Sequence, residues 1–194
     1  MRMTNGQVRR VILILLIAGW LPGQSARAEK TENADPALKA LYHWRRGYVY
    51  HLLRQFPMAI AEYRKSIAAK PTAEGHTFLG WSLSMLERYR EAIAECKKAI
   101  PLDPDFGNPY NDIGVYLVAL DRVDEAIPYL KKAIRSKRYC CYQFAHHNMG
   151  RALVLKGRYE EAMRSFKKAL DYDPDYEPSK QVLRVLRERA GREL

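Results

Sequence analysis

Two adjacent pairs of side chains have the greatest capacity for chemistry in this sequence, Cys140-Cys141 and His146-His147. Thiolates and imidazoles are preferred ligands of zinc and copper, so their closeness suggests a metal-binding or thiol-reactive site. However, the sequence has neither the C-x-x-C nor the H-x-x-x-H spacing that such sites commonly use. We therefore expect no metal and no cofactor, and a thiol- or metal-binding protein is the least favoured of three functional hypotheses.

The third cysteine and the lack of catalytic motifs argue against enzyme chemistry. Cys96 falls on a core position of a helical pattern, so we interpret it as a small apolar residue. Cys140 and Cys141 allow a bridge to an outside partner, a strained bridge to each other, or reduced packing. No G-x-S-x-G, G-x-x-x-x-G-K-[ST] or H-E-x-x-H motif occurs, and we expect no enzyme activity and no catalytic residues.

The first 28 residues have the three parts of a secretory signal. Arg9-Arg10 form a charged start, an apolar run follows over 11–20, and Ala26-Arg27-Ala28 gives the small-x-small cleavage pattern. The apolar run is shorter than the ~20 residues that span a bilayer. The sequence therefore predicts cleavage after Ala28 and export to the periplasm or the medium. An uncleaved segment that anchors the protein in the inner membrane is the alternative.

The charge balance is basic but does not by itself select a partner. The 194 residues carry a formal net charge of +11, and removal of the four arginines of the first 28 residues, which contain no acid, leaves +7. Lysine and arginine are interleaved with glutamate and aspartate along the helical patterns, which indicates solvated faces. We therefore expect no nucleic-acid partner.

An internal repeat shows which elements must position these side chains. Gly47, Gly80, Gly114 and Gly150 recur at steps of 33, 34 and 36 residues. Twelve residues after each glycine comes an alanine, and seven residues later another small residue: Ala59, Ala92, Ala126 and Ala162, then Ser66, Ala99, Ala133 and Ala169. Twelve residues after the first alanine three copies have a proline, and the third has Arg138. This register predicts four stacked helical hairpins.

Helix packing explains the register. Glycine in the first helix and alanine in the second allow the two backbones to approach where the helices cross, while larger side chains fill the space around them. On the second helices these side chains are Tyr63, Cys96, Leu130 and Phe166. After Pro178, the spacing of Val182, Leu183 and Leu186 predicts a last helix with one apolar face, which would cap the stack.

The fourth copy, His146-x-x-Met149-Gly150-x-x-Leu153 followed by Gly157-Arg158-Tyr159-Glu160-Glu161-Ala162, resembles the tetratricopeptide repeat (TPR), whose period is 34 residues. The resemblance covers about residues 40–176. It implies an all-α, right-handed TPR solenoid of four helix-turn-helix repeats and a C-terminal capping helix. The expected organisation is a signal peptide at 1–28, a polar lead-in at 29–39, repeats at 40–72, 73–106, 107–142 and 143–176, and the capping helix at 177–194.

The sequence departs from the family pattern at three kinds of position. The usual tryptophan at the fourth repeat position is replaced by His43, His76, Tyr110 and His146. The glycine of the turn inside each repeat survives only as Gly157, and Arg54, Glu87 and Asp121 replace it. The third repeat has a two-residue insertion, and we expect its turn at 137–143 to bulge from the solenoid.

The resemblance also implies a concave face, lined by the first helix of each repeat, that binds a partner. Its family positions form an aromatic half and a polar half in this chain. The aromatic half is Trp44, Tyr48, Phe78 and Trp81, and the polar half is Asn108, Asn111, Asp112, His147, Asn148 and Arg151. An extended peptide could place apolar side chains on the first half, bond its backbone to the asparagine amides and pair a carboxylate with Arg151.

These features favour a non-enzymatic adaptor or scaffold of the bacterial cell envelope that binds a protein or peptide partner in the concave groove. The alternative is a self-assembling structural scaffold, in which homo-oligomers form through the terminal helix. Asn148 matches a common family residue and could serve only to hold the helices in place, and Trp44 could pack beneath the lead-in.

Overall fold

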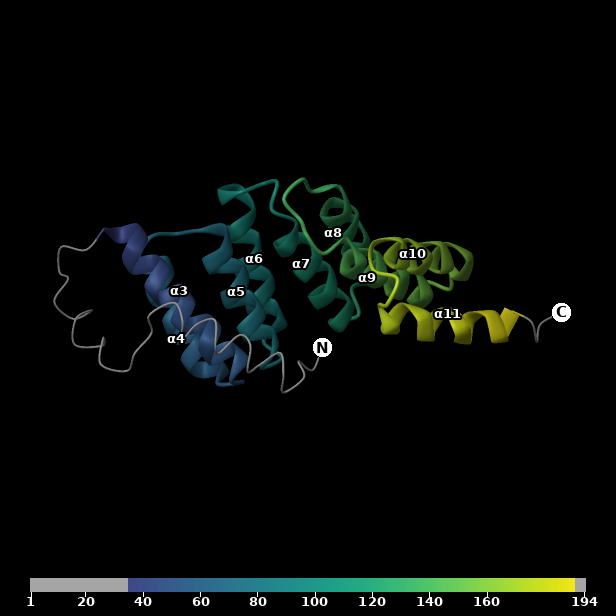
Figure 1. Cartoon of the computed structure of the whole chain (residues 1–194), viewed down its shortest axis with the longest axis horizontal. Helices are drawn as coiled ribbons and strands as arrows, with labels where there is room; N and C mark the ends of the chain where they lie inside the picture. Colours follow the sequence, from purple (N-terminus) through teal and green to yellow (C-terminus); the bar gives the residue numbers. More distant parts are fainter. Residues whose placement is uncertain (1–34, 191–194) are drawn as a thin grey trace.

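The computed structural model describes residues 35–190, and within this range the chain forms nine α-helices and no β-strand (Figure 1). The helices are α3 (Pro36–Leu52), α4 (Phe56–Ala69), α5 (Ala73–Ser84), α6 (Tyr89–Leu102), α7 (Gly107–Ala119), α8 (Val123–Arg135), α9 (Tyr142–Leu155), α10 (Tyr159–Tyr172) and α11 (Glu177–Ala190). Asp35 caps α3, since its carboxylate accepts a hydrogen bond from the Ala37 amide at 2.9 Å and Pro36 opens the helix. Residues 36–39 of the expected lead-in are therefore helical.

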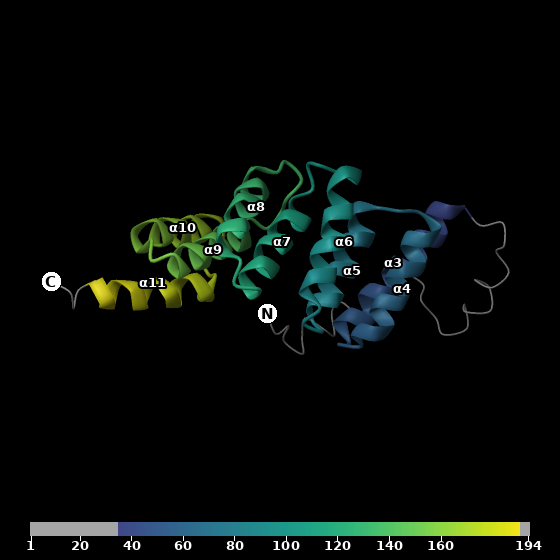
Figure 2. The same cartoon turned by 180° about the vertical axis from the view of Figure 1, so that it is seen from behind.

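The helices form four hairpins in a row, and the views from the two sides show the same order along the long axis of the molecule (Figures 1 and 2). α3 packs on α4, α5 on α6, α7 on α8 and α9 on α10, and α4, α6 and α8 also contact the first helix of the next hairpin. α11 packs on α10 at the end of the row. This arrangement confirms the expected all-α solenoid with a capping helix.

The helices of each hairpin cross at the predicted small residues. A Cβ atom on Gly114 would lie 2.6 Å from Leu130, and one on Gly150 would lie 2.7 Å from Phe166. The equivalent distances are 2.7 Å from Gly47 to Tyr63 and 2.9 Å from Gly80 to the Cys96 Sγ. The four partner alanines of the second helices, Ala59, Ala92, Ala126 and Ala162, are fully buried. The glycines are therefore required by close approach of the helices.

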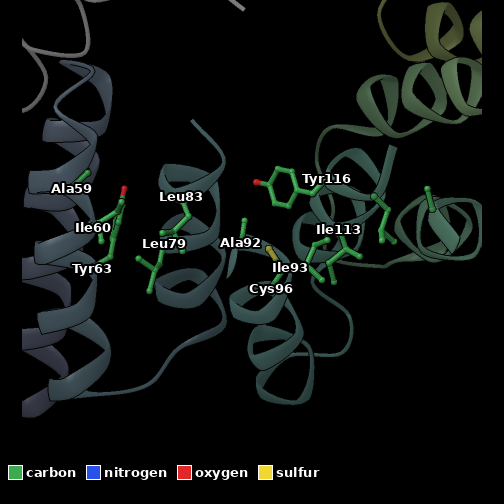
Figure 3. Close-up of a cluster of buried hydrophobic side chains, with 12 residues drawn as sticks. Ala59, Ile60, Tyr63, Leu79, Leu83, Ala92, Ile93, Cys96, Ile113 and Tyr116 are labelled. Carbon is green, nitrogen blue, oxygen red and sulfur yellow. The ribbon is translucent and has the colours of Figure 1, made fainter. Parts of the chain in front are cut away.

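The hydrophobic core is continuous along the row rather than centred in one place. One cluster joins the first three hairpins, and Figure 3 shows Tyr63, Leu83, Cys96 and Ile113 following one another along it from helix to helix. A second cluster joins α8, α9 and α10 to Leu183 and Leu186 of the last helix. Each hairpin is thus stabilised by its neighbours, as in other solenoids.

The turns inside the four hairpins share one backbone conformation. Arg54, Glu87 and Asp121 have φ values of 60°, 59° and 59°, and Gly157 has a φ of 71°. These are the four positions at which the sequence comparison aligned one glycine with three replacements. The backbone therefore keeps the left-handed turn even where the residue disfavours it.

The expectation that the turn at 137–143 bulges from the solenoid is wrong. The Arg138 amide donates to the Asp105 carbonyl at 2.9 Å, and the Gly107 amide donates to the Arg138 carbonyl at 3.1 Å. The Tyr139 ring is buried against Gly107. The longer turn therefore lies back on the preceding turn, because backbone pairing and burial of an aromatic ring stabilise it there.

The predicted signal peptide at 1–28 and residues 29–34 of the lead-in lie outside the described residues. In the part that is described, no helix combines the length and the apolar character needed to cross a membrane.

Candidate functional site

The first helices of the hairpins form an inner layer. α3 contacts α5, α5 contacts α7, and α7 contacts α9. A row of hairpins curves toward the layer whose helices lie closer together, so these first helices line the concave side. The sequence placed every candidate partner-binding residue on this layer.

The aromatic half is a continuous wall across α3 and α5. Trp44 stacks on Tyr48 with ring centroids 5.6 Å apart, and both rings meet Phe78 edge-on, at 5.0 Å and 5.7 Å. Phe78 in turn meets Trp81 edge-on at 5.7 Å. Trp81 is 37% exposed, so the wall ends on a large aromatic surface open to solvent.

His51 fixes this exposed end of the wall. Its ring lies 3.8 Å from the Trp81 ring, and its Nδ1 lies 2.8 Å from the Ser82 hydroxyl. Burial, with a smaller effect of nearby Arg54, lowers the pKa of His51 to about 4. The imidazole is therefore neutral at physiological pH and supports Trp81 as an apolar platform.

An apolar cleft of about 280 Å³ adjoins the wall at the start of α3 and α5. Leu41 and Trp44 form one side, and Thr72 and Glu74 lie across from them. Leu41 is 42% exposed. The cleft has the size and lining to accept one large apolar side chain of a bound segment.

The polar half is organised by a chain of side-chain amides from α7 to α9. The Asn148 amide donates to the Asn111 Oδ1 at 2.9 Å, and the Asn111 amide donates weakly to the Asp112 carboxylate at 3.3 Å. Asn108 lies half-buried one turn before, and Arg151 is exposed one turn after Asn148. Arg151 makes no hydrogen bond or ion pair within residues 35–190 and is available to a ligand.

His147 differs from the rest of the predicted polar half, because the last helix covers it. Its Nδ1 lies 2.9 Å from the Ser179 hydroxyl, and Tyr176 packs edge-on against the ring at 5.2 Å. Burial, together with nearby Arg151, lowers the pKa of His147 to about 4. This neutral side chain holds α11 in place rather than facing an open surface.

Histidines at the fourth repeat position have a partner that sequence reasoning missed. His43 lies 2.8 Å from Glu62, and His76 lies 2.7 Å from Glu95, each through Nδ1 and Oε2. Both pairs join the two helices of one hairpin and span 19 residues. The hydrogen bond from His76 holds the pKa of Glu95 below its usual range. The sequence signal that could have revealed these pairs is a glutamate 19 residues after the histidine in both repeats.

Arg138, which stands where the other repeats have proline, is the second missed residue. Its guanidinium donates to Asp103 at 2.6 Å and to Glu74 at 2.9 Å, and it lies 4.0 Å above the Phe106 ring. It therefore ties three segments together near the aromatic half of the groove.

The two cysteines of the long turn have free thiols with sulfur atoms 2.7 Å apart. Burial and the neighbouring Cys140 raise the pKa of Cys141 to about 12, so its thiol stays protonated at neutral pH. Cys96 is fully buried at the crossing of α5 and α6. Among the described residues, no group of three or more His, Cys, Asp or Glu side chains is placed to hold a metal ion.

The comparisons with known proteins agree on the architecture. Family models described as "Tetratricopeptide repeat" match residues 40–72, 73–106, 108–140 and 143–176. The mitochondrial import receptor subunit TOM70 of Rattus norvegicus is 26% identical over 137 residues, which cover 70% of this chain and 22% of the receptor. The chain thus spans about a fifth of the length of this relative.

Two solved structures have the same fold. PilF of Pseudomonas aeruginosa superposes with a TM-score of 0.75 at 20% identity, over 81% of this chain and 72% of that one. YrrB, described as a TPR protein with an unusual peptide-binding site, superposes with a TM-score of 0.61 at 22% identity, over 74% and 73% of the two chains.

Proposed function

Because the chain belongs to the tetratricopeptide repeat family, whose members are generally non-catalytic interaction modules, we propose that it is an adaptor that binds a peptide segment of a partner protein in its concave groove. The observation that carries this proposal is the groove itself. An aromatic wall that ends on the partly exposed Trp81 lies beside a polar half in which Arg151 makes no hydrogen bond or ion pair within residues 35–190.

The chemistry of the groove suits an extended peptide. Trp81 and the apolar cleft beside Trp44 supply surfaces for two apolar side chains. Aromatic rings and arginine contribute more binding energy at interfaces than other residue types do. Peptide binding is also a use of this fold, as the description of YrrB states.

The cellular setting is proposed from the sequence. The signal-like residues 1–28 support export, so the adaptor would act in the bacterial cell envelope, in the periplasm or attached to the inner membrane. The partner would then be an envelope protein with a segment that can extend along the groove.

An affinity pull-down from cross-linked envelope extract tests the proposal. The native chain is compared with a variant carrying Trp81→Ala and Arg151→Ala, both at exposed groove positions. A control variant carries Tyr172→Ala and Arg184→Ala, which are exposed on α10 and α11. We expect a small set of partners that native and control chains retain and the groove variant loses.

The same pull-down distinguishes the groove-binding adaptor from the alternative, a self-assembling scaffold. If all three chains retrieve the same proteins, the groove is not the binding site and the proposal is wrong. If they retrieve only further copies of this chain, the protein is a self-assembling scaffold. Circular dichroism of each variant establishes that the helices are intact.

A further inference from the structure

Asp112 is the carboxylate that the fold leaves without a counter-charge. It lies half-buried on α7 in the polar half of the groove. Its one hydrogen bond comes from the neutral amide of Asn111, at 3.3 Å. No lysine, arginine or histidine forms an ion pair with it within residues 35–190. A carboxylate removed from water without such compensation is unusual, because its desolvation is unfavourable.

The other shielded carboxylates of the described chain show the contrast. Each one that is not exposed contacts a cation or a backbone amide. Glu62, Glu74, Glu95, Asp103 and Glu161 form ion pairs, and Asp173 accepts the Asp175 amide. Asp112 alone depends on a side-chain amide. The fold elsewhere supplies partners for its acids, so the missing partner at Asp112 marks a position for an external group.

The groups around Asp112 leave this position open to a donor. The charge of Asp112 interacts with three neighbouring side chains, Cys96 on α6, Tyr116 on α7 and Tyr139 before α9. None of these three side chains carries a positive charge. The Tyr116 hydroxyl is buried without a hydrogen-bond partner and points toward the α5 side (Figure 3). Ser84 of α5 lies near it but donates its own hydroxyl to the Trp81 carbonyl at 2.8 Å.

Burial raises the pKa of Asp112 to about 7, and the Asn111 hydrogen bond opposes this rise. A substantial fraction of the carboxyl group is therefore protonated at neutral pH when the groove is empty. A cation that approached the carboxylate would favour ionisation and form a charge-assisted hydrogen bond.

We propose that Asp112 is a specificity-determining residue that selects a lysine or arginine side chain in the bound segment, next to an apolar residue on the aromatic wall. This inference rests on the proposed peptide-binding function. The basic side chain of the ligand would donate to the Asp112 carboxylate, beside the asparagine amides that bond the backbone. The same carboxylate would repel an acidic side chain at this position.

The test uses a positional library of random octapeptides with acetylated and amidated ends, so that a cation can come only from a side chain. Beads carrying the native chain, Asp112→Asn, Asp112→Lys or Trp81→Ala are washed and the bound peptides sequenced. Asp121→Asn, a change at an exposed turn acid, is the matched control. A second library with free amino ends tests the terminal amine as the source of the cation.

We expect the native chain and Asp121→Asn to enrich lysine or arginine at one position beside an apolar residue. Asp112→Asn should lose the basic enrichment roughly tenfold while the apolar enrichment remains. Asp112→Lys should enrich aspartate or glutamate instead. Asparagine in place of a desolvated carboxylate removes no packing, so this variant should fold.

Three outcomes would overturn the inference. The native chain could enrich apolar residues, with this enrichment lost in Trp81→Ala, and yet enrich no basic residue. That result would support the proposed function and refute the role of Asp112. Basic enrichment that is unchanged in Asp112→Asn, or that appears only with free amino ends, would refute it equally. No enrichment of any kind by the native chain would instead contradict the proposed function.

Discussion

At the scale of single residues, the groove contains charged side chains without an ionic partner among the described residues and an aromatic surface that is exposed to solvent. Trp81 is partly exposed to solvent although its ring packs against His51 and Phe78. Arg151 and Asp112 have no ionic partner in the region from 35 to 190. The proposed peptide ligand would supply the contacts that these side chains lack, since aromatic rings and arginine often dominate binding energy.

Asp112 should make the folded protein less stable as the pH rises. The pKa of this carboxyl group is about 7 in the folded chain, whereas an ordinary aspartate, as in the unfolded chain, has a pKa of 3.8, so unfolding releases a proton at pH values between the two. Stability should fall across this range. We expect Asp112→Asn to be more stable than the native chain at pH 8 by roughly 1–3 kcal/mol, allowing for its partial exposure.

Thermal unfolding at pH 4 and pH 8 measures this difference. Asp121→Asn, at an exposed turn, serves as the comparison. The stabilities of the native chain and of Asp112→Asn should converge near pH 4, where the Asp112 carboxyl group is protonated in the folded chain. A difference that is equal at both pH values, or a less stable Asp112→Asn at pH 8, would show that the carboxyl is compensated after all.

Sequence reasoning located individual groove residues unevenly. The aromatic half was predictable because spacings of three and four residues on one helix, together with the repeat register, place its rings on the same layer. The burial of His147 was not, since Ser179 and Tyr176 lie about 30 residues further along the chain. Contacts with the last helix depend on how it packs, which no local pattern specifies.

At the scale of elements, three of the four turns inside the hairpins hold a non-glycine residue in the left-handed region, which strains the backbone. Glu87 has a φ of 59°, and a side chain in this region costs about 1 kcal/mol relative to glycine. Its carboxylate is exposed and forms no ion pair in the described chain. We expect Glu87→Gly to raise the free energy of unfolding by roughly 0.5–1 kcal/mol in urea titrations.

Gly157 provides the reverse experiment at the equivalent turn. A Cβ there would meet no atom within 4 Å, so Gly157→Ala changes only the backbone preference at a φ of 71°. The free energy of unfolding should fall by about 1 kcal/mol. If Glu87→Gly weakens the protein, or Gly157→Ala leaves it unchanged, the left-handed turns are not strained as described.

The same scale shows where pattern and structure diverged. The helix crossings followed directly from glycine and alanine at fixed spacing, because close approach leaves no room for other side chains. The turn at 137–143 did not, because an extra length of chain has no periodicity. Its position depends on the burial of Tyr139 and on backbone bonds to residues 105–107.

At the scale of the whole molecule, stability should depend on contacts between neighbouring hairpins. Leu186 of α11 is 8% exposed and belongs to the cluster that contains Phe166, whereas Val185 on the same helix is 61% exposed. Leu186→Ala should destabilise the last hairpin by roughly 2–4 kcal/mol, and Val185→Ala should have little effect.

Hydrogen exchange followed by mass spectrometry resolves this effect along the chain. Leu186→Ala should speed amide exchange in α9, α10 and α11 well before it does so in α3 and α4, since a solenoid transmits stability through nearest neighbours. Uniform acceleration over all the helices would indicate one cooperative unit and contradict this view.

The central claim, that the concave layer binds a partner protein, is tested most directly by photo-cross-linking. A photoreactive phenylalanine analogue replaces Met85, which caps the end of α5 one turn after Trp81, or Met58 on the second-helix layer in α4. The two methionines are 41% and 48% exposed, so they form a matched pair. In cells that naturally produce this protein, we predict that the analogue at position 85 cross-links to a discrete partner protein and that the analogue at position 58 does not. Equal products from both positions, or products from position 58 alone, would show that the groove is not the binding surface.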